Sequence, residues 1–265
     1  MYAFTYERPK SVDAAVKLLK KADDGKLLAG GQTLLPAMKL RLASPSTIVD
    51  LSGLKGLSGI KASSKAVTIG ALTRHVEVMN SPHVQKAIPA LAHLASLIGD
   101  PAVRNRGTIG GSLANNDPSA DYPAAALGLG ATIKTNKREI EADKFFKGLF
   151  ETALAGDEII ESVSFPVPDK AGYEKFPNPA SRFALVGVFV SKSKGGARVA
   201  VTGAGEGGVF RVKEMEAALA KDWSAKAIEG IKVPPKGMIA DLHGTAEYRA
   251  HLIGVMARRA VAAAK

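Results

Sequence analysis

The 265-residue chain contains no cysteine. Without thiolates it can form no internal disulfide bond, and it can hold neither a cysteine-bound metal ion nor an iron–sulfur cluster. Its five histidines are scattered without the spacing of metal ligands, and His83 and His93 fit the surfaces of helices better. We therefore predict no metal site, and any cluster that works with this chain must lie on another polypeptide.

Long apolar runs are also absent. The longest, residues 124–133, is shorter than the roughly 18 residues that a membrane-spanning helix requires. Residues 1–8 lack the apolar stretch of a signal peptide. These two absences predict a protein without a membrane span that stays in the cytoplasm.

Lysine and arginine are abundant but nowhere concentrated. The net charge is +11, which makes nucleic-acid binding the obvious alternative function. No block of five like charges occurs, however, and aromatic residues make up only 6% of the chain and do not interleave with the basic ones. We expect no nucleic-acid binding, and a basic surface that is either solvated or docks acidic partner chains.

Glycine, hydroxyl and acidic residues are concentrated in the segment Arg106–Asp121, RGTIGGSLANNDPSAD. Glycine lets the backbone approach a ligand closely and expose consecutive N–H groups to an anion. Thr108 and Ser112 add hydroxyl donors, and Asp121 before Tyr-Pro predicts a helix cap. Amides for a phosphate and a carboxylate for a sugar hydroxyl suit a dinucleotide. For a lone Gly-Gly pair, a plain glycine-rich turn would be the alternative.

A second glycine pair lies in Lys26–Thr33, KLLAGGQT. A short apolar strand, a glycine turn and a helix start follow one another, an order that favours an anion. Neither the Gly-x-Gly-x-x-Gly fingerprint nor a P-loop is present, which argues against the ordinary nucleotide folds. Two separate glycine segments can instead clamp one diphosphate from both sides.

Catalytic motifs are missing. The chain has no Gly-x-Ser-x-Gly elbow, no cysteine nucleophile and no clear carboxylate pair. Asp117 and Asp121 lie four residues apart, but a cap plus a sugar contact explains them better than acid–base catalysis. We predict no catalytic residue, so the chain supplies binding and electrostatic tuning for a cofactor.

The sequence pattern of the first 168 residues predicts two structural units. Strands near residues 3–6, 27–29 and 48–51 alternate with helices, an order that predicts a small unit with parallel strands. From Leu57 the pattern changes to a mixed sheet of about five strands flanked by helices. The expected elements of this second unit are hairpins within 60–69 and 131–141, helices at 73–79, at 86–98 with Gly99 as cap, and after Asp121, and a strand at 159–165.

Residues 166–179 have the proline, glycine and asparagine content of a linker. After it we expect three antiparallel strands joined by glycine-rich turns, followed by helices. The run Gly203–Gly208 is interpreted as a turn, because no βαβ frame or acidic ribose ligand supports a nucleotide loop. The strands are expected at 183–190, 198–201 and 209–212, and the helices at 213–221, 224–229 and 245–264.

These segments closely resemble the FAD-binding medium subunit of molybdenum hydroxylases of the xanthine dehydrogenase and aerobic carbon monoxide dehydrogenase type. The resemblance rests on AGGQTLLPAMK at 29–39 and on DPAVRNRGTIGGSLANNDPSAD at 100–121, with FALVGV at 183–188 and DLHGTAEYR at 241–249. It implies an α+β, two-subdomain FAD-binding fold like that of vanillyl-alcohol oxidase, with a small C-terminal domain of three antiparallel strands and helices. The implied boundaries are 1–168, with subdomains of about 1–56 and 57–168, and 178–265.

The resemblance also implies roles for individual residues. Lys26 to Thr33 would wrap the FAD diphosphate, and Thr108 to Ser112 would close its other side. Asp121 would bind ribityl or ribose hydroxyls, and Phe183 would lie near the isoalloxazine or, alternatively, simply pack in a core strand. The implied cofactor-binding residues are Lys26, Leu28, Ala29, Gly30, Gly31, Gln32, Thr33, Ile98, Gly99, Thr108, Ile109, Gly110, Gly111, Ser112, Asn115, Asp117, Asp121, Ile160 and Phe183, of which Ile98, Gly99 and Ile160 would line the adenine or ring pocket.

In the scheme that the resemblance implies, a large partner subunit carries the molybdenum cofactor and a small one carries two [2Fe–2S] clusters. Electrons would pass from the clusters through this FAD to an external acceptor, in a complex expected to be a dimer of heterotrimers. Two alternatives stay open from the sequence. One is a free-standing flavin oxidase or dehydrogenase of the same superfamily, and the other is a non-enzymatic basic binding protein.

Overall fold

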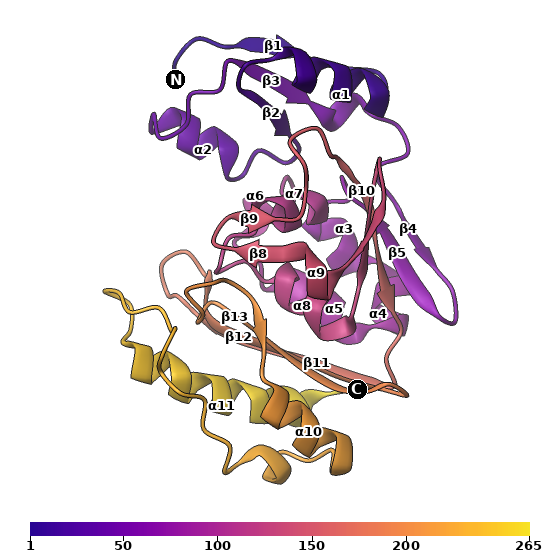
Figure 1. Ribbon diagram of the computed structural model, residues 1–265. Helices are drawn as coiled ribbons and strands as arrows, with labels where there is room; N and C mark the ends of the chain where they lie inside the picture. The colour runs from indigo at the N-terminus through magenta and orange to yellow at the C-terminus, as the bar shows by residue number, and fades with distance from the viewer.

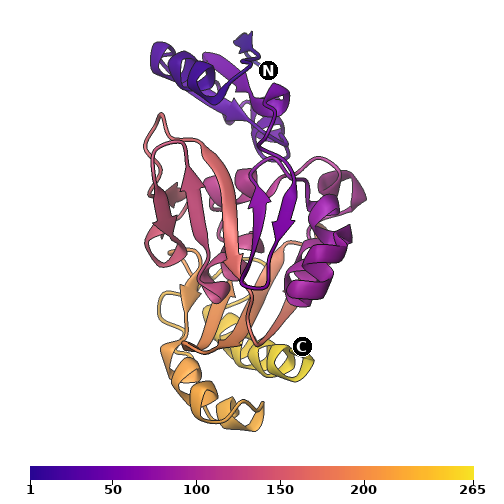
Figure 2. The same cartoon turned by 90° about the vertical axis from the view of Figure 1, so that its right-hand side faces the viewer.

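The computed structural model describes residues 1–265 in three tiers (Figure 1). The N-terminal tier lies at one end, the C-terminal tier at the other, and the middle of the chain lies between them. Figure 2 shows the same order from the side, with the strands of the middle sheet running from top to bottom of the view. None of the helices combines the length and the apolar character needed to cross a membrane.

The first tier is the predicted β-α-β-α-β unit. Its three strands pair in parallel in the order β1-β3-β2, because each strand is followed by a helical connection that returns the chain to the same edge. Ser11 caps the first helix by accepting the N–H of Ala14 at 3.2 Å. The elements are β1 (Thr5–Glu7), α1 (Val12–Lys21), β2 (Gly25–Leu28), α2 (Leu34–Lys39), β3 (Thr47–Asp50) and the 3-10 turn η1 (Leu51–Gly53).

The second tier contains a five-stranded sheet of order β4-β5-β10-β6-β7. The two hairpins are confirmed, but the expectation of a mixed sheet is wrong. The late strand β10 enters between them and pairs antiparallel with both neighbours, so every pairing is antiparallel. The strands are β4 (Ile60–Ala62), β5 (Ala66–Gly70), β6 (Thr132–Thr135), β7 (Glu139–Glu141) and β10 (Ile160–Pro166), with a small separate hairpin of β8 (Phe146–Gly148) and β9 (Glu151–Thr152).

Helices cover this sheet, and one expected helix is broken. The helix expected over 86–98 ends at Ala87 and restarts at Pro89, because proline lacks an N–H and favours the first helical position. Gly99 does not follow the last turn directly, since the C-cap is Leu97. The helices are α3 (His75–Asn80), α4 (Pro82–Ala87), α5 (Pro89–Ser96), α6 (Pro101–Arg104), α7 (Ile109–Asn115), α8 (Tyr122–Leu129) and α9 (Ala142–Phe145).

The third tier is a four-stranded antiparallel sheet rather than the expected three-stranded one. The segment expected to be a linker forms β11, which pairs with β12 from Lys170 to Pro177. The pairing satisfies the backbone of the long, buried β12, whose other edge bonds to β13. The elements are β11 (Lys170–Pro177), β12 (Ala184–Ser193), β13 (Gly196–Thr202), β14 (Phe210–Arg211), α10 (Lys213–Lys221), the 3-10 turn η2 (Lys226–Ile228) and α11 (Ala246–Ala263). The glycine-rich run 203–208 is a turn between β13 and β14, as expected.

The second and third tiers share a hydrophobic core. Tyr173 and Phe189 of the C-terminal sheet belong to the same buried cluster as Tyr122 and the rest of α8. The opposite face of that sheet packs on α10 and α11 through a separate cluster that includes Val188 and Met256. The C-terminal sheet is therefore sandwiched between helices and forms one continuous body with the middle tier.

Arg249 of α11 is the largest fully buried side chain, with 1% of its surface exposed. Its Nη2 donates to both carboxylate oxygens of Asp241 at 2.8 Å, and its Nη1 donates to the carbonyl oxygens of Leu185 and Gly203, both at 2.8 Å. A fixed fork of donors suits this task, which lysine could not perform in the same way. Arg249 therefore ties α11, the 241 loop, β12 and the turn after β13 together.

We expect Arg249→Met to lower the free energy of unfolding by roughly 3–5 kcal/mol, because it leaves two carbonyls and a carboxylate without their donor. Chemical denaturation followed by circular dichroism measures the change. Arg259→Met, at an exposed position of the same helix, is the matched control. Equal stability of the two variants would contradict the anchoring role.

Candidate functional site

The first glycine segment, residues 29–33, connects β2 to α2. The backbone N–H groups of these five residues donate to no other protein atom. Gly31 has a positive φ of 73°, a conformation that turns neighbouring amides to one side of the chain. The segment contains no acidic residue and remains half-buried to exposed. It is therefore a row of unpaired amides open to an anion.

The second segment, residues 107–112, is built differently from the expected glycine loop. Thr108 is the N-cap of α7, and the Gly-Gly pair lies inside the first turn of that helix. The amides of Ile109 and Gly110 bond to the carbonyls of Thr73 and Ala71 at 3.1 and 2.8 Å. Those of Gly111 and Ser112 bond to Thr108. In this segment only the Thr108 amide is unpaired, which corrects the expectation that both segments offer free amides.

The structure brings the two segments together, backbone against backbone. A Cβ atom on Gly30 would lie 2.3 Å from the Arg106 carbonyl oxygen and 2.7 Å from the Gly107 Cα. One on Gly111 would lie 3.7 Å from the Ala29 Cβ. Since real side-chain atoms do not approach backbone at 2.3 Å, only glycine fits at position 30. The segment 29–33 thus lies against Arg106 and Gly107, just before α7 begins.

His75 supports this contact from behind. Its imidazole packs so closely under Gly107 that a Cβ there would lie 2.5 Å from its Nε2 atom. The ring is 5% exposed and its centroid lies 5.3 Å from that of Tyr122. Neither the His75 Nδ1 nor the Tyr122 hydroxyl has a hydrogen-bond partner. Burial, with the charge of Arg104, lowers the pKa of His75 from 6.5 to about 4, so the ring is neutral at physiological pH.

Asp121 does not cap α8 as expected. Its backbone is already helical, with φ −76° and ψ −45°, and its side chain makes no capping bond. The carboxylate turns inward, where the Tyr173 hydroxyl donates to Oδ1 at 2.6 Å and the Lys175 Nζ lies 2.9 Å from the same atom. Burial raises the pKa of the Asp121 carboxyl, whereas Lys175 and Tyr173 both oppose that shift.

The other expected site residues are spread around this centre. Arg104 donates to the carbonyls of Ile98 and Gly99 at 2.9 and 3.0 Å, which holds that turn beside the second segment. Ile160 lies buried in β10, in the same core cluster as Ile109 of α7. Asp117 shapes its own turn by accepting the Ser119 amide at 2.8 Å. Asn115 is the last residue of α7.

Two expected residues, Lys26 and Phe183, have their contacts elsewhere, whereas the Leu28 side chain lies against Gly31, with its Cδ1 3.2 Å from the position of a Cβ there. Lys26 is exposed on β2, with its Nζ 3.5 Å from Asp24, and Leu28 is the half-buried last residue of the same strand. Phe183 precedes β12 and packs edge-on against His243, at a centroid distance of 5.5 Å. Phe183 therefore packs against a residue of the C-terminal tier.

Sequence reasoning missed His75, Tyr173 and Lys175. His75 stands alone in the sequence, and only the fold places it under Gly107. Tyr173 and Lys175 are two apart, the spacing that puts side chains on one face of a strand, but the proline and asparagine around them suggested a linker. The strand alternation Tyr-Glu-Lys was the signal that could have identified them.

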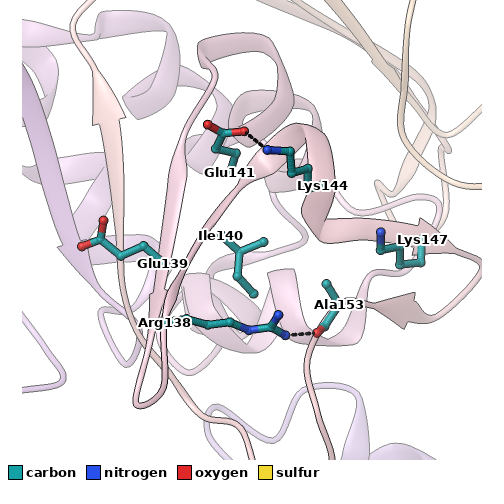
Figure 3. Close-up of a pocket in the computed structure, with 7 residues that line it drawn as sticks. All are labelled: Arg138, Glu139, Ile140, Glu141, Lys144, Lys147 and Ala153. Atoms are coloured by element: carbon teal, nitrogen blue, oxygen red, sulfur yellow. Dashed lines mark hydrogen bonds and ion pairs between the residues drawn. The ribbon is translucent and has the colours of Figure 1, made fainter.

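A depression of about 570 Å³ lies elsewhere, over β7 and α9 (Figure 3). In Figure 3, Lys144 pairs with Glu141 at 2.8 Å and Arg138 reaches the Ala153 carbonyl, whereas no partner is drawn for Glu139 and Lys147. Arg138 also pairs with the buried Glu158 at 3.0 Å. None of the lining residues belongs to the glycine segments, and we assign this depression no function.

Comparison with known proteins identifies the family. Residues 2–168 match the family described as the FAD-binding domain in molybdopterin dehydrogenase. Along 98% of its length the chain is 35% identical to the nicotine 6-hydroxylase medium subunit of Paenarthrobacter nicotinovorans, covering 96% of it. It is also 35% identical to the carbon monoxide dehydrogenase medium chain of Hydrogenophaga pseudoflava, with 98% of this chain and 96% of that one covered. The chain belongs to the FAD-binding medium subunits of molybdenum-cofactor dehydrogenases.

Solved structures agree. The medium subunit superposes on carbon monoxide dehydrogenase from Hydrogenophaga pseudoflava with a TM-score of 0.87 and 36% identity, covering 99% of this chain and 97% of the other. For quinoline 2-oxidoreductase from Pseudomonas putida the TM-score is 0.87 at 29% identity, with 98% and 96% covered. The α+β fold expected from the sequence is confirmed, as are FAD as the cofactor and a role as an oxidoreductase component.

The geometry of the medium subunit also fits FAD. A diphosphate needs several N–H donors and no nearby carboxylate, and residues 29–33 provide both conditions. Arg106, whose backbone meets Gly30, is an exposed cationic residue, whereas the buried Thr108 hydroxyl accepts the Gly111 amide. The backbone approach at Gly30 leaves the amide row fixed rather than mobile, which lowers the entropic cost of binding.

His75 makes the stability of the medium subunit depend on pH. Between pH 6.5 and about 4 the unfolded His75 binds a proton that the folded one excludes, so folding loses stability as the pH falls through this window. We expect His75→Phe to reduce that loss by up to roughly 3 kcal/mol. Urea unfolding at a series of pH values measures it, with His83→Phe as the matched surface control. Identical pH dependence in wild type and His75→Phe would rule out a buried neutral ring.

Proposed function

We propose that this medium subunit transfers electrons from iron–sulfur clusters on a partner chain, through its FAD, to an external acceptor. The observation that carries the proposal is the row of free amides at 29–33, held against the start of α7 in a chain of this family. Bound FAD supplies the redox chemistry, because it can take up and release electrons. The chain itself binds and orients the cofactor.

Each group near the centre then has a binding role. The amides of residues 29–33 hold the diphosphate, and Thr108 with Ser112 closes its other side. Asp121 accepts from ribityl or ribose hydroxyls, with Asn115 and Asp117 nearby. Ile98, Gly99 and Ile160 line the ring pocket, and Phe183 lies at the isoalloxazine; for these four residues the support is the family resemblance rather than a contact with the amide row.

The division of labour among subunits has two supports. The relatives are named medium subunits or medium chains. One solved relative is a carbon monoxide dehydrogenase described as lacking the Mo-pyranopterin moiety of the molybdenum cofactor, and another is described as a Cu,Mo-CO dehydrogenase. This chain has no cysteine, and no group of three or more His, Asp or Glu side chains is placed to hold a metal. We propose that a large partner carries the molybdenum cofactor and a small partner the [2Fe–2S] clusters. A dimer of heterotrimers and a cytoplasmic location stay predictions.

The experiment that tests this function is affinity purification of the tagged chain from its native host. We expect it to retain two further chains together with molybdenum, iron and FAD in the eluate, and a visible spectrum that dithionite bleaches. Metal analysis and absorption spectroscopy provide the readouts. A chain that carries FAD and oxidises a substrate without any partner would contradict the electron-transfer role.

Adding one methyl group at Gly30 tests whether the segment with the free amides binds FAD. We expect Gly30→Ala to weaken FAD binding by about tenfold or more, which corresponds to about 1.4 kcal/mol, because the added Cβ forces the two segments apart. Flavin fluorescence quenching measures the affinity. Gly230→Ala, where a Cβ would meet nothing within 4 Å, is the control. Unchanged FAD affinity in Gly30→Ala would show that the close approach of the segments does not matter for the cofactor.

A further inference from the structure

The turn at 117–121, which follows the helix of the second glycine segment, is held by the C-terminal sheet. The Thr202 hydroxyl lies 2.9 Å from the Pro118 carbonyl oxygen and 2.6 Å from that of Ala120. The Gly203 amide also donates to Pro118, at 2.8 Å. Both donors come from the end of β13 or the turn that follows it. The last residue of this turn is Asp121, whose carboxylate faces the same sheet.

Two side chains of β11 complete the connection. The Tyr173 hydroxyl donates to Asp121 Oδ1 at 2.6 Å, and the Lys175 ammonium lies 2.9 and 3.1 Å from the two carboxylate oxygens. Lys175 also donates to the Leu97 carbonyl at 3.0 Å, the residue before the Ile98–Gly99 turn. One ammonium group therefore fixes two separate segments of the second tier.

Burying the charges of Lys175 and Asp121 costs desolvation free energy. The side chains of Lys175 and Asp121 are 2% and 6% exposed, so both charges have been taken out of water. A buried ion pair contributes little net stability compared with apolar side chains of the same size, but it fixes geometry sharply because all its donors and acceptors must be satisfied. Here three donor contacts converge on a carboxylate that lies in an expected cofactor-binding segment.

We propose that Tyr173 and Lys175 are positioning residues for FAD: acting from the C-terminal sheet, they fix Asp121 and the Leu97–Gly99 turn in the arrangement that orients the bound cofactor. The inference rests on the proposed role of Asp121 and this turn in the FAD site. It makes the cofactor site a joint product of all three tiers, although the matched FAD-binding domain ends at residue 168.

Two conservative variants separate positioning from stability. Tyr173→Phe keeps the ring that packs near Phe189 and removes only the hydroxyl donor, whereas Lys175→Met keeps the length of the stem and removes the charge. Lys170→Met, at an exposed position of the same strand, is the matched control. The full-length chain is titrated with FAD, and the visible circular dichroism of the flavin is recorded at saturation. Urea unfolding of the FAD-free chains reports stability separately.

We expect both variants to bind FAD about tenfold more weakly and to change the flavin dichroism at saturation, while Lys170→Met matches the wild type. A variant that merely loses stability would, once saturated, show the wild-type dichroism, and that result would overturn the positioning role. If Lys175→Met does not fold, Tyr173→Phe decides alone, and a wild-type affinity and spectrum in it would equally overturn the inference. Failure of the wild type itself to bind FAD would count against the proposed function instead.

Discussion

The FAD site depends first on the contact between the backbone at Gly30 and the backbone at Arg106 and Gly107. No side chain can stand between them, because a Cβ on Gly30 would collide with the Arg106 carbonyl at 2.3 Å. This contact brings the first tier against the second and places the segment 29–33 beside the residues that precede α7. The buried His75 ring packs directly against Gly107, which limits the movement of this backbone. The FAD site depends on this packing of bare backbone.

The two sides of the site have unequal tasks. The segment at 29–33 lies between a strand and a helix, and its N–H groups donate to neither, although the Gly31 and Thr33 carbonyls accept from α2. In the segment at 107–112, the amides of Ile109 and Gly110 bond to the residues that follow β5, and those of Gly111 and Ser112 bond to Thr108. These bonds fix the segment in place. A free donor row held beside a segment whose amides are already bonded is a preorganised anion site, where little reorganisation opposes binding. The C-terminal sheet extends this rigidity to the 117–121 turn.

The sequence allowed prediction of those features that depend on local pattern. Glycine pairs located both segments, alternating apolar residues located the two hairpins, and the helix expected at 213–221 is present as α10. What failed depends on partners distant in the chain. The strand β11 looked like a linker because its pairing with β12 cannot be read from its prolines and lysines. The amides at 109–110 looked free because their acceptors, Ala71 and Thr73, lie far upstream. Asp121 looked like a cap for the same reason.

Hydrogen–deuterium exchange of the backbone amides, with and without FAD, tests the central claim most directly. The free amides at 29–33 should exchange rapidly in the FAD-free chain and become strongly protected when FAD binds. The amides at 109–112 should change little, because they already have acceptors in the protein. Exchange at 29–33 that is the same with saturating FAD as without it would contradict the account.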